Sequence, residues 1–430
     1  MNVLILGGGG REHALAWSIA KSEKCEQLYV APGNAGTHQI AENVPIAPTE
    51  FIQVKEFAEK KNIHLIVVGP EAPLVAGIKD FFVEAQVKDL QVLGPDKAAA
   101  MLEGSKDFAK QFMQENDIPT AAYKTFTADS LENGKAFIDS LQPPYVLKAD
   151  GLAGGKGVLI IDDIDEAKNQ LDEMLLHQKF GSAAQQVVIE EFLDGTEMSI
   201  FVLTDGEDYK ILPTAKDYKR IGDGDTGLNT GGMGAISPNL LADDELIKKV
   251  EDKIVKPTLQ GLKNRNYDYK GFIFLGLMII DSEPFVIEYN VRLGDPETEA
   301  ILPRIKTDLL DVLDQTSKGK LADIEIEISD EFTATLILAS GGYPGSYEKG
   351  KEISGLDETR ENELIFHAGT KFSNDKVVTS GGRVVAVTSL SIDLRTAIKK
   401  TYDSSEKINF AGKYNRSDIG KDMIKQEREA

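Results

Sequence analysis

NVLILGGGGREH, at residues 2–13, is the stretch that decides the fold of the first part of the chain. A short β-prone run enters four glycines at 7–10, and a helical pattern follows at once. A strand, a glycine turn and a helix in immediate succession are typical of a parallel α/β sheet. The backbone N–H groups of such a turn, at the N-terminus of a helix, suit a phosphate. A tight turn without any ligand is the alternative.

The same alternation continues through the first hundred residues. Strands are expected at 2–6, 27–31, 64–70 and 91–95, and helices at 11–21, 50–61 and 74–85. This pattern predicts a doubly wound parallel sheet, whose ligand crevice lies at the carboxyl ends of the strands. A dinucleotide site is disfavoured because Glu12 stands where the fingerprint needs its third glycine, and strand 27–31 ends without an acidic residue.

Two further units follow the first sheet. A helical stretch at 97–117 ends at the breaker Asp-Ile-Pro, 117–119. The middle region has an α+β character, with strands at 145–149, 187–193, 197–204, 272–280 and 285–290 and helices at 163–180 and 243–265. The last region combines strands at 333–340, 364–367 and 383–389 with a helix at 392–400, which predicts a small mixed α/β domain. We therefore expect a multidomain chain divided at residues 1–103, 104–325 and 326–430.

Composition narrows the classes of partner. The formal net charge is −22, from 48 basic and 70 acidic side chains, which opposes binding to nucleic acid or to anionic membranes. The longest apolar run, at 272–280, is too short to span a bilayer. Cys25 is the one cysteine, and a packing role is expected for it. The N-terminus resembles a strand more than a signal peptide, so the mature start is expected at Met1 and the location in the reducing cytoplasm.

A second glycine-rich loop, DGLAGGKG at 150–157, follows a predicted strand. It does not match the phosphate loop of P-loop proteins, because Asp150 and Gly157 stand at the wrong positions. A flexible loop that carries Lys156 could close over phosphates and offset their charge. A plain hairpin linker is an equally good interpretation of this segment alone.

Acidic residues gather at 190–197, EEFLDGTE. Such a charge run is usually a solvated edge. Here it brackets Phe192 and Leu193, an apolar pair that could sandwich a base while main-chain groups bond its edge. Glu197 could then accept hydrogen bonds from ribose hydroxyls.

Glu288, Asn290 and Arg292 alternate along a predicted strand and so share one face. Two oxygen ligands on one face can hold Mg²⁺ while phosphate oxygens and water complete its octahedron, and Mn²⁺ accepts the same ligands. A surface strand could show the pattern by chance, but apolar neighbours indicate burial, and a buried acid needs a cation or a donor.

One long connection and five histidines complete the candidates. NTGGMGA at 229–235, preceded by DYKR at 217–220, has the length and composition of a functional loop. His13, His38, His64 and His177 show no metal-like spacing, and a structural role is expected for each. His367, at the end of a predicted strand, is more noticeable, although a core or capping role is the better interpretation.

Seven motifs occur in an order that resembles one family, the phosphoribosylamine–glycine ligases (glycinamide ribonucleotide synthetases). They are GGREHA at 9–14, APGNAG at 31–36, VGPE at 68–71, LEGSK at 102–106, KADG at 148–151, NTGGMG at 229–234 and GDPE at 294–297. Each is weak alone, but together they make the match specific, and the resemblance extends from Met1 to about residue 420.

The resemblance implies an ATP-grasp fold with a mobile lid at about residues 120–190. It also implies the reaction: ATP phosphorylates the carboxylate of glycine, and the amine of 5-phosphoribosylamine attacks the glycyl phosphate. Small-molecule substrates, a monomer, and ATP with Mg²⁺ or Mn²⁺ are expected. Converting a carboxylate oxygen into a phosphate leaving group requires charge neutralisation and in-line positioning, which the lysines and the metal pair could supply.

The resemblance also implies residue roles. ATP phosphates would be held by Lys106, Lys148 and the 151–157 loop with Gly154, Lys156 and Gly157. The rest of the nucleotide would be bound by Glu190, Glu191, Leu193 and Glu197, and the metal by Glu288 and Asn290. Catalytic roles fall to Lys148, Asp217, Lys219 and Arg292. Substrate binding falls to Gly8, Gly9, Gly10, Arg11, Gly33, Asn34, Glu71, Asn229, Gly231 and Gly232.

Four positions depart from the family pattern, namely Gly8, Tyr218, Leu228 and Leu293. Each lies at the edge of a site and replaces no charged group, so activity is expected while affinity could differ. Two rival functions remain. A different carboxylate–amine ligase on the same scaffold, such as a carboxylase, is disfavoured by the N-terminal motifs. A non-catalytic nucleotide-binding protein would be expected to lack the metal pair or the loop lysine, and both are present.

Overall fold

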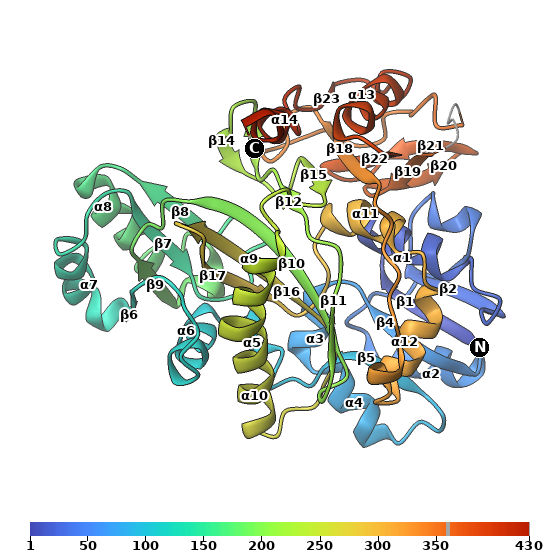
Figure 1. Cartoon of the computed structure of the whole chain (residues 1–430), viewed down its shortest axis with the longest axis horizontal. Coiled ribbons are helices and arrows are strands. Elements are labelled where there is room, and N and C mark those ends of the chain that lie inside the picture. Colours follow the sequence, from blue (N-terminus) through green and yellow to red (C-terminus); the bar gives the residue numbers. More distant parts are fainter. Residues whose placement is uncertain (358–361, 430) are drawn as a thin grey trace.

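The structure, a computed structural model, describes residues 1–357 and 362–429. Figure 1 shows three regions around a central twisted sheet: the N-terminal sheet in blue on one side, a teal unit that projects to the other side, and the red C-terminal region above the centre and the N-terminal sheet. The predicted fold class is confirmed, because a parallel sheet, an ATP-grasp unit and a small C-terminal α/β region are all present. In the described ranges no helix has the length and apolar character that crossing a membrane requires.

The N-terminal sheet is parallel and doubly wound. Its order is β3 (Glu42–Asn43), β2 (Gln27–Pro32), β1 (Asn2–Gly7), β4 (Ile63–Val68) and β5 (Gln91–Pro95). One face packs on α1 (Gly10–Ile19) and α12 (Leu309–Ser317), and the other on α2 (Phe51–Lys60) and α4 (Ile78–Ala85). The order in which the strands are added to the sheet reverses between β1 and β4. The carboxyl ends of these two strands therefore border the ligand crevice.

Three helical predictions differ from the structure. The helix expected at 74–85 is two helices, α3 (Glu71–Ala76) and α4, because Gly77 takes a left-handed conformation with φ +91°. The helix expected at 97–117 divides into α5 (Met101–Gly104) and α6 (Lys106–Glu115), since the extended Ser105 caps the second. The helix expected at 243–265 begins as α9 (Asp244–Val250), passes through a π turn at Glu251–Val255 and ends as α10 (Lys256–Asn264).

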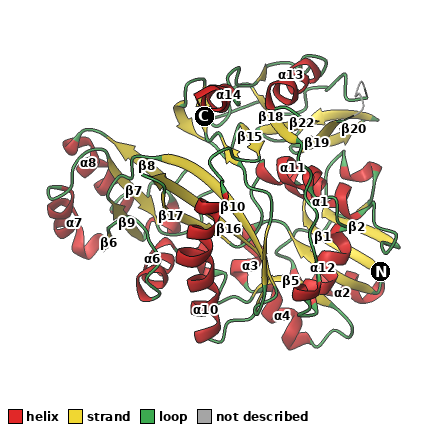
Figure 2. Cartoon of the chain, in the orientation of Figure 1, coloured by secondary structure: helices red, strands yellow, loops and turns green. Residues whose placement is uncertain are grey.

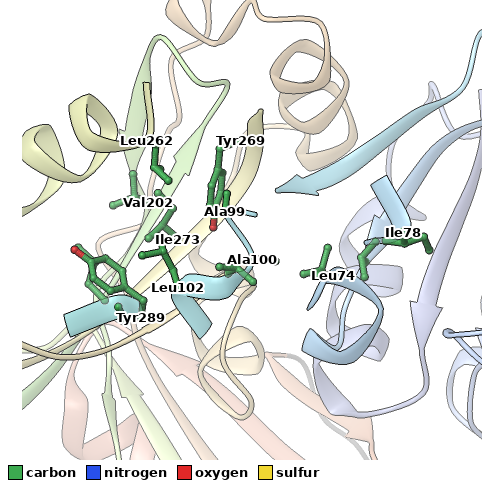
Figure 3. Close-up of a cluster of buried hydrophobic side chains, with 14 of the residues drawn as sticks. Leu74, Ile78, Ala99, Ala100, Leu102, Val202, Leu262, Tyr269, Ile273 and Tyr289 are labelled. Carbon is green, nitrogen blue, oxygen red and sulfur yellow. The ribbon is translucent and has the colours of Figure 1, made fainter. Parts of the chain in front are cut away.

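The central strands extend the N-terminal sheet. β11 (Tyr209–Ile211), β10 (Thr196–Thr204), β16 (Tyr269–Ile280) and β17 (Glu283–Asn290) are antiparallel, and Tyr269 and Lys270 pair with Pro95 and Gly94 of β5. One buried cluster unites the two parts: Leu74 and Ile78 belong to it together with Ile273 and Tyr289 (Figure 3). The central strands and the N-terminal strands therefore form one continuous sheet.

The lid has its own sheet and core. Its strands are β6 (Tyr123–Thr127), β9 (Gln186–Glu190), β7 (Tyr145–Ala149) and β8 (Val158–Ile161), in that order. α7 (Leu131–Ile138) and α8 (Ile164–Leu175) cover it on the side away from the central sheet (Figure 2). Because its apolar cluster is separate, the lid could move as a unit, and that motion stays a prediction.

The C-terminal sheet takes two strands from the middle of the chain. Its order is β12 (Lys216–Asp217), β15 (Gly234–Ser237), β18 (Phe332–Ser340), β22 (Arg383–Ser391) and β19 (Glu363–His367), and β23 (Lys413–Tyr414) pairs with β18. α13 (Leu394–Ser405) packs on this sheet. The excursion between β12 and β15 carries the hairpin β13 (Arg220–Gly222) and β14 (Thr226–Asn229).

The remaining elements are short. They are the hairpin β20 (Thr370–Ser373) and β21 (Lys376–Thr379), the helices α11 (Glu297–Ile301) and α14 (Lys421–Glu429), and 3₁₀ turns at Thr37–Gln39, Ala128–Ser130, Gly181–Ala184, Leu302–Arg304 and Leu321–Asp323.

Candidate active site

A cavity of about 540 Å³ lies between the lid, the central sheet and the N-terminal rim. Its lining includes apolar side chains of the lid and the central sheet, such as Val146, Ile160 and Met278, together with many charged groups. The cavity is large enough for a nucleotide-sized ligand. Most of the predicted nucleotide, metal and catalytic residues line it: Lys106, Lys148, Gly154, Gly157, Glu190, Glu191, Leu193, Glu197, Asp217, Lys219, Glu288, Asn290 and Arg292.

At the lid end, one buried carboxylate receives two lysines. Glu190 Oε2 lies 2.9 Å from Lys148 Nζ and 3.1 Å from Lys110 Nζ. Burial alone would raise the pKa of Glu190, but the two lysines hold it below its usual value. The other oxygen, Oε1, is buried without a hydrogen-bond partner. Because a buried acceptor without a donor is costly, this oxygen suits a donor on a bound ligand.

Lys110 was not identified from the sequence. It stands on α6 four residues after Lys106, so the two side chains share one helical face, and both line the cavity. That spacing was the available signal. Burial lowers the pKa of Lys110 to about 8, although Glu190 opposes the shift.

The segment after Glu190, predicted to bind a base, is joined by two hydrogen bonds to Ala122, which precedes β6. The N–H of Glu191 donates to the carbonyl of Ala122 at 3.0 Å, and Glu191 Oε1 accepts from the N–H of Ala122 at 2.8 Å. The N–H of Glu191 is therefore already used. Base binding by Glu191 and Leu193 stays a prediction, and it would fall to the carbonyl of Glu191 and the main-chain groups of Leu193. Phe192, which is 37% exposed, lines the same end of the cavity.

Glu288 and Asn290, on β17, face a group of cations. Burial opposes ionisation of Glu288, but Lys219, Lys148, Lys106 and Arg292 lower its pKa, so the carboxylate stays charged. Within residues 1–357 and 362–429, no group of three or more His, Cys, Asp or Glu side chains is spaced to hold a metal ion. Two protein oxygens suit Mg²⁺, which keeps several waters and shares phosphate oxygens with the substrate. The donor set therefore fits a nucleotide-bound magnesium ion.

Lys219 stands between three acids. Its Nζ lies 3.2 Å from Glu197, 3.6 Å from Glu288 and 3.9 Å from Asp217. Burial alone would lower the pKa of Lys219, but Asp217, Glu197 and Glu288 raise it well above its usual value. Burial raises the pKa of Asp217 to about 6 against the opposing effect of Lys219. Asp217 and Lys219, both predicted to be catalytic, therefore interact strongly through their charges.

Glu297 joins this group, although no role was assigned to it from the sequence. It lines the cavity and is 3% exposed. Burial raises its pKa to about 8, and Asp217 adds to the effect. The motif GDPE at 294–297 carried the signal, but the sequence does not show which of its residues points inward.

Arginines and acids pair along the N-terminal rim. Arg292 Nη2 lies 2.7 Å from Glu103 Oε1, and its Nε lies 3.5 Å from Glu71. Arg11 Nε lies 2.7 Å from Glu12, and its Nη1 donates to the carbonyl of Leu293 at 3.1 Å. Arg11, Glu71 and Arg292 all line the cavity, so the rim brings these predicted residues together.

The glycine turn lies beside the cavity and does not line it. The N–H of Gly9 donates to Glu12 Oε2 at 2.6 Å, and the N–H of Arg11 to Asp295 Oδ2 at 3.3 Å. The pairing of β1 with β2 places the predicted 31–36 motif next to the turn, and Asn34 Nδ2 donates to the carbonyl of Gly8 at 3.0 Å. Carboxylates thus occupy two N–H groups expected for phosphate, and phosphate binding by Gly8, Gly9, Gly10, Gly33 and Asn34 stays a prediction.

The two glycine-rich loops meet over the opening. Lys156 is outside the lining, and its Nζ donates to the carbonyl of Pro344 at 3.1 Å. Gly154 and Gly155 take left-handed conformations, with φ +57° and +76°. Asn229 and Gly231 line the cavity, whereas Gly232 does not. The lid loop therefore provides main-chain groups here, and phosphate binding by Lys156 would need its side chain to leave Pro344.

Comparison with known proteins finds one family for three consecutive parts of the chain. Family models match residues 1–103 as the N domain of phosphoribosylglycinamide synthetase, residues 104–298 as its ATP-grasp (A) domain and residues 333–422 as its C domain. The chain belongs to the phosphoribosylglycinamide synthetase family. The family resemblance of the seven motifs is thereby confirmed, and so is the ATP-grasp fold.

Relatives in the phosphoribosylglycinamide synthetase family are similar to this chain over nearly all of its length. The phosphoribosylamine–glycine ligase of Caldanaerobacter subterraneus subsp. tengcongensis is 46% identical, over 97% of this chain and 99% of that protein. The bifunctional purine biosynthetic protein of Pichia angusta is also 46% identical, over 99% of this chain but 54% of that protein. The chain therefore spans about half of the bifunctional relative.

Solved structures agree with this assignment. The crystal structure of phosphoribosylamine–glycine ligase from Thermotoga maritima has a TM-score of 0.85 and 39% identity, over 97% of this chain and 100% of that one. The biotin carboxylase domain of 2-oxoglutarate carboxylase from Hydrogenobacter thermophilus, in complex with MgADP, has a TM-score of 0.75 at 16% identity, over 96% and 91%. The second likeness shows the fold alone.

Proposed function

We propose that this chain joins glycine to 5-phosphoribosylamine at the expense of ATP, giving glycinamide ribonucleotide, ADP and phosphate. The observation that carries the proposal is the full-length identity of 46% to a phosphoribosylamine–glycine ligase. The cavity supports it, because lysines, a carboxylate–amide pair and a charge-coupled acid group meet there.

The reaction would proceed through glycyl phosphate. Lys106 and Lys148 would bind the phosphates of ATP, and the carbonyl of Glu191 with the groups of Leu193 would bind adenine. Asp217 and Lys219 would orient glycine, with its carboxylate toward the γ-phosphate and the lysine offsetting the negative charge. Such preorganised charges are the main source of catalysis in phosphoryl transfer.

The metal would be Mg²⁺, or Mn²⁺, held by Glu288 and Asn290. When bound, it neutralises phosphate charge and favours the in-line geometry. Arg292, fixed by Glu103 on one side, would keep a positive charge directed at the acyl phosphate. The residues at 8–11 would receive the phosphoribosyl group, so that its amine can reach the activated carbonyl carbon. A monomer is part of the same proposal.

The test is an assay of inorganic phosphate release in which each substrate is omitted in turn. We expect phosphate release at the full rate only with ATP, glycine and phosphoribosylamine together. A rate that is equally high with another acid, such as bicarbonate, would assign the chain to a different ligase. No release under any condition would favour a nucleotide-binding protein without catalytic activity.

A further inference from the structure

Arg383, the first residue of β22, reaches the active site from the C-terminal sheet. Its Nη1 donates to the carbonyls of Gly231 at 2.7 Å and Asp295 at 2.6 Å, with a longer contact of 3.4 Å to that of Gly232. Its Nη2 lies 3.0 Å from Asp295 Oδ1. The guanidinium lines the cavity and joins two segments that are distant in sequence. No role was predicted for it from the sequence.

The first of these segments runs from the end of β12 to β15 and includes Asp217, the last residue of β12, and Lys219. The hydroxyl of Tyr343 accepts the N–H of Gly231 at 3.1 Å, beside the contacts of Arg383. At the other end of the excursion, Arg416 donates to the carbonyl of Arg220 at 3.1 Å. The C-terminal region therefore fixes both ends of the segment on which glycine is expected to bind.

The second segment is the turn at Asp295, and it leads to the N-terminal rim. Asp295 Oδ1 faces Arg383, while Oδ2 accepts the N–H of Arg11 at 3.3 Å, at the start of α1. Burial opposes ionisation of Asp295, but Arg383 and Arg11 hold its pKa below the usual value. One charged carboxylate thus links Arg383 to the turn where the phosphoribosyl group is expected.

The packing leaves little freedom at this junction. A Cβ atom added to Gly231 would stand 2.9 Å from Arg383 Cζ. Gly232 has φ +117°, and a Cβ atom there would stand 2.4 Å from Cδ of Pro296. The loop can therefore lie this close to the guanidinium and to the Asp295 turn only with glycine at both positions. The position of the guanidinium in turn sets where the loop lies.

We propose that Arg383 is a positioning residue, which keeps the glycine side of the site, at 217–232, aligned with the phosphoribosyl side, at 8–11. This inference rests on the proposed function. Its consequence concerns the second half of the reaction. In that step the amine nitrogen bonds to the carbonyl carbon of glycyl phosphate, the carbon–oxygen bond to phosphate breaks, and the amine releases a proton. A misplaced amine leaves the same carbon open to water, which returns glycine and phosphate.

The experiment compares Arg383→Ala and Arg383→Lys with the wild-type enzyme and counts glycinamide ribonucleotide formed per ADP. The wild type should give one product per ADP. For Arg383→Ala we expect amide formation to fall about 100-fold, the cost of a misplacement near 1 Å, while ADP formation falls less. The product per ADP therefore drops. The product per ADP of Arg383→Lys should lie between those of the wild type and Arg383→Ala. An ammonium keeps the charge but lacks the planar fork that spans both segments.

Arg304→Ala is the matched control. Arg304 is a buried arginine that also joins carbonyl groups, with bonds of 2.7 Å to Glu331 and 2.8 Å to Ser329, but it does not line the cavity. This variant should melt at a lower temperature and still give one product per ADP.

Two outcomes would overturn the inference. One is an unchanged product per ADP in both Arg383 variants, even where amide and ADP formation fall together, and the other is equal uncoupling in Arg304→Ala. If Arg383→Ala does not fold, the folded Arg383→Lys decides by the same ratio. Wild-type protein that forms no ADP with both substrates present would instead refute the proposed function, and the inference with it.

Discussion

Glu288 is the residue on which the proposed chemistry depends most directly. Lysines and Arg292 lower the pKa of its carboxyl group, and its Oε1 lies 3.6 Å from Lys219 Nζ. A charged oxygen held at this distance from its cationic neighbours is available to a divalent ion. Asn290 adds a neutral oxygen on the same face of β17.

Replacing Glu288 tests this interpretation. We expect Glu288→Ala to lower kcat more than ~100-fold and to raise the Mg²⁺ concentration needed for half-maximal rate, since loss of even an outer-shell partner of a metal costs 10–100-fold. Steady-state rates over a Mg²⁺ titration provide the measurement. Glu283→Ala is the control, because Glu283 is on the same strand but pairs with Lys249 at the surface. A Glu288→Ala enzyme with normal rate and metal dependence would place the metal ligands elsewhere.

Single residues also mark the limit of what the sequence reveals. Lys148, Glu288 and Lys219 could be predicted, because a motif or an alternating pattern identifies them. For Lys110 the sequence offers only its four-residue spacing from Lys106, and for Arg383 it offers no signal, because each side chain contacts residues that are far away in the chain. Local patterns show which face a side chain occupies, but not which distant segment it meets.

At the scale of elements, the lid loop and helix α6 form one unit. Asp150 Oδ1 accepts the hydroxyl of Ser105 and the N–H of Asp107, both at 2.8 Å, and the carbonyl of Asp150 accepts the N–H of Lys106 at 3.1 Å. The start of the loop thus caps the helix that carries Lys106. An acidic group at a helix N-terminus also interacts favourably with the helix dipole.

Asp150→Ala should therefore weaken both stability and nucleotide binding. We expect a loss of about 1–2 kcal/mol in the free energy of unfolding, as for the removal of other N-terminal caps. The KM for ATP should rise as well, because Lys106 and the loop lose their common anchor. Urea denaturation and steady-state kinetics measure the two effects.

Asp163→Ala separates the two effects. Asp163 caps the lid helix α8 through a 2.8 Å bond from the N–H of Glu166 and has no part in the cavity lining. This variant should lose similar stability with an unchanged KM for ATP. A KM that rises equally in both variants would mean that Asp150 acts through lid stability alone.

The predictions of elements were accurate where periodicity decides and wrong where one residue breaks it. Strand positions such as β5 and β7 could be predicted because short β-prone runs are bounded by turns. The helix expected at 74–85 was wrong because Gly77 interrupts an otherwise continuous apolar pattern. A glycine inside a helical pattern is often tolerated, so the sequence does not show that the chain turns there.

For the whole molecule, the origin of the C-terminal sheet could not be predicted. β12 and β15 belong to the middle of the chain, yet β15 pairs with β18 from Gly234–Leu336 to Ser237–Thr333. Pairing of segments about a hundred residues apart leaves no local signal. As a result, the loop predicted to bind the substrate glycine connects two strands of the C-terminal sheet. This explains why residues such as Arg383 and Tyr343 contact the active site.

A second junction between the N- and C-terminal regions is made by two buried histidines. The N–H of His367 donates to His13 Nδ1 at 2.8 Å, and the carbonyl of His367 accepts from Asn34 at 2.7 Å. The ring of His13 and the main chain of His367 therefore join the two regions, which agrees with the structural role expected for His13. Burial, with His367, lowers the pKa of His13 to about 3, and burial lowers the pKa of His367 to about 4 although Asp357 opposes the shift.

These two groups predict the acid sensitivity of the whole molecule. In the unfolded chain both histidines bind protons below pH about 6.5, whereas in the folded protein they stay neutral to about pH 4. Between these pH values the unfolded state binds more protons, so the free energy of unfolding falls as the pH decreases. Each group contributes at most about 1.4 kcal/mol per pH unit. Urea unfolding between pH 7 and pH 4.5 should show a smaller loss of stability for His13→Gln than for the wild type, and an unchanged loss for His177→Gln, whose side chain is exposed. Equal pH dependence in His13→Gln and the wild type would show that the buried pair does not control acid stability.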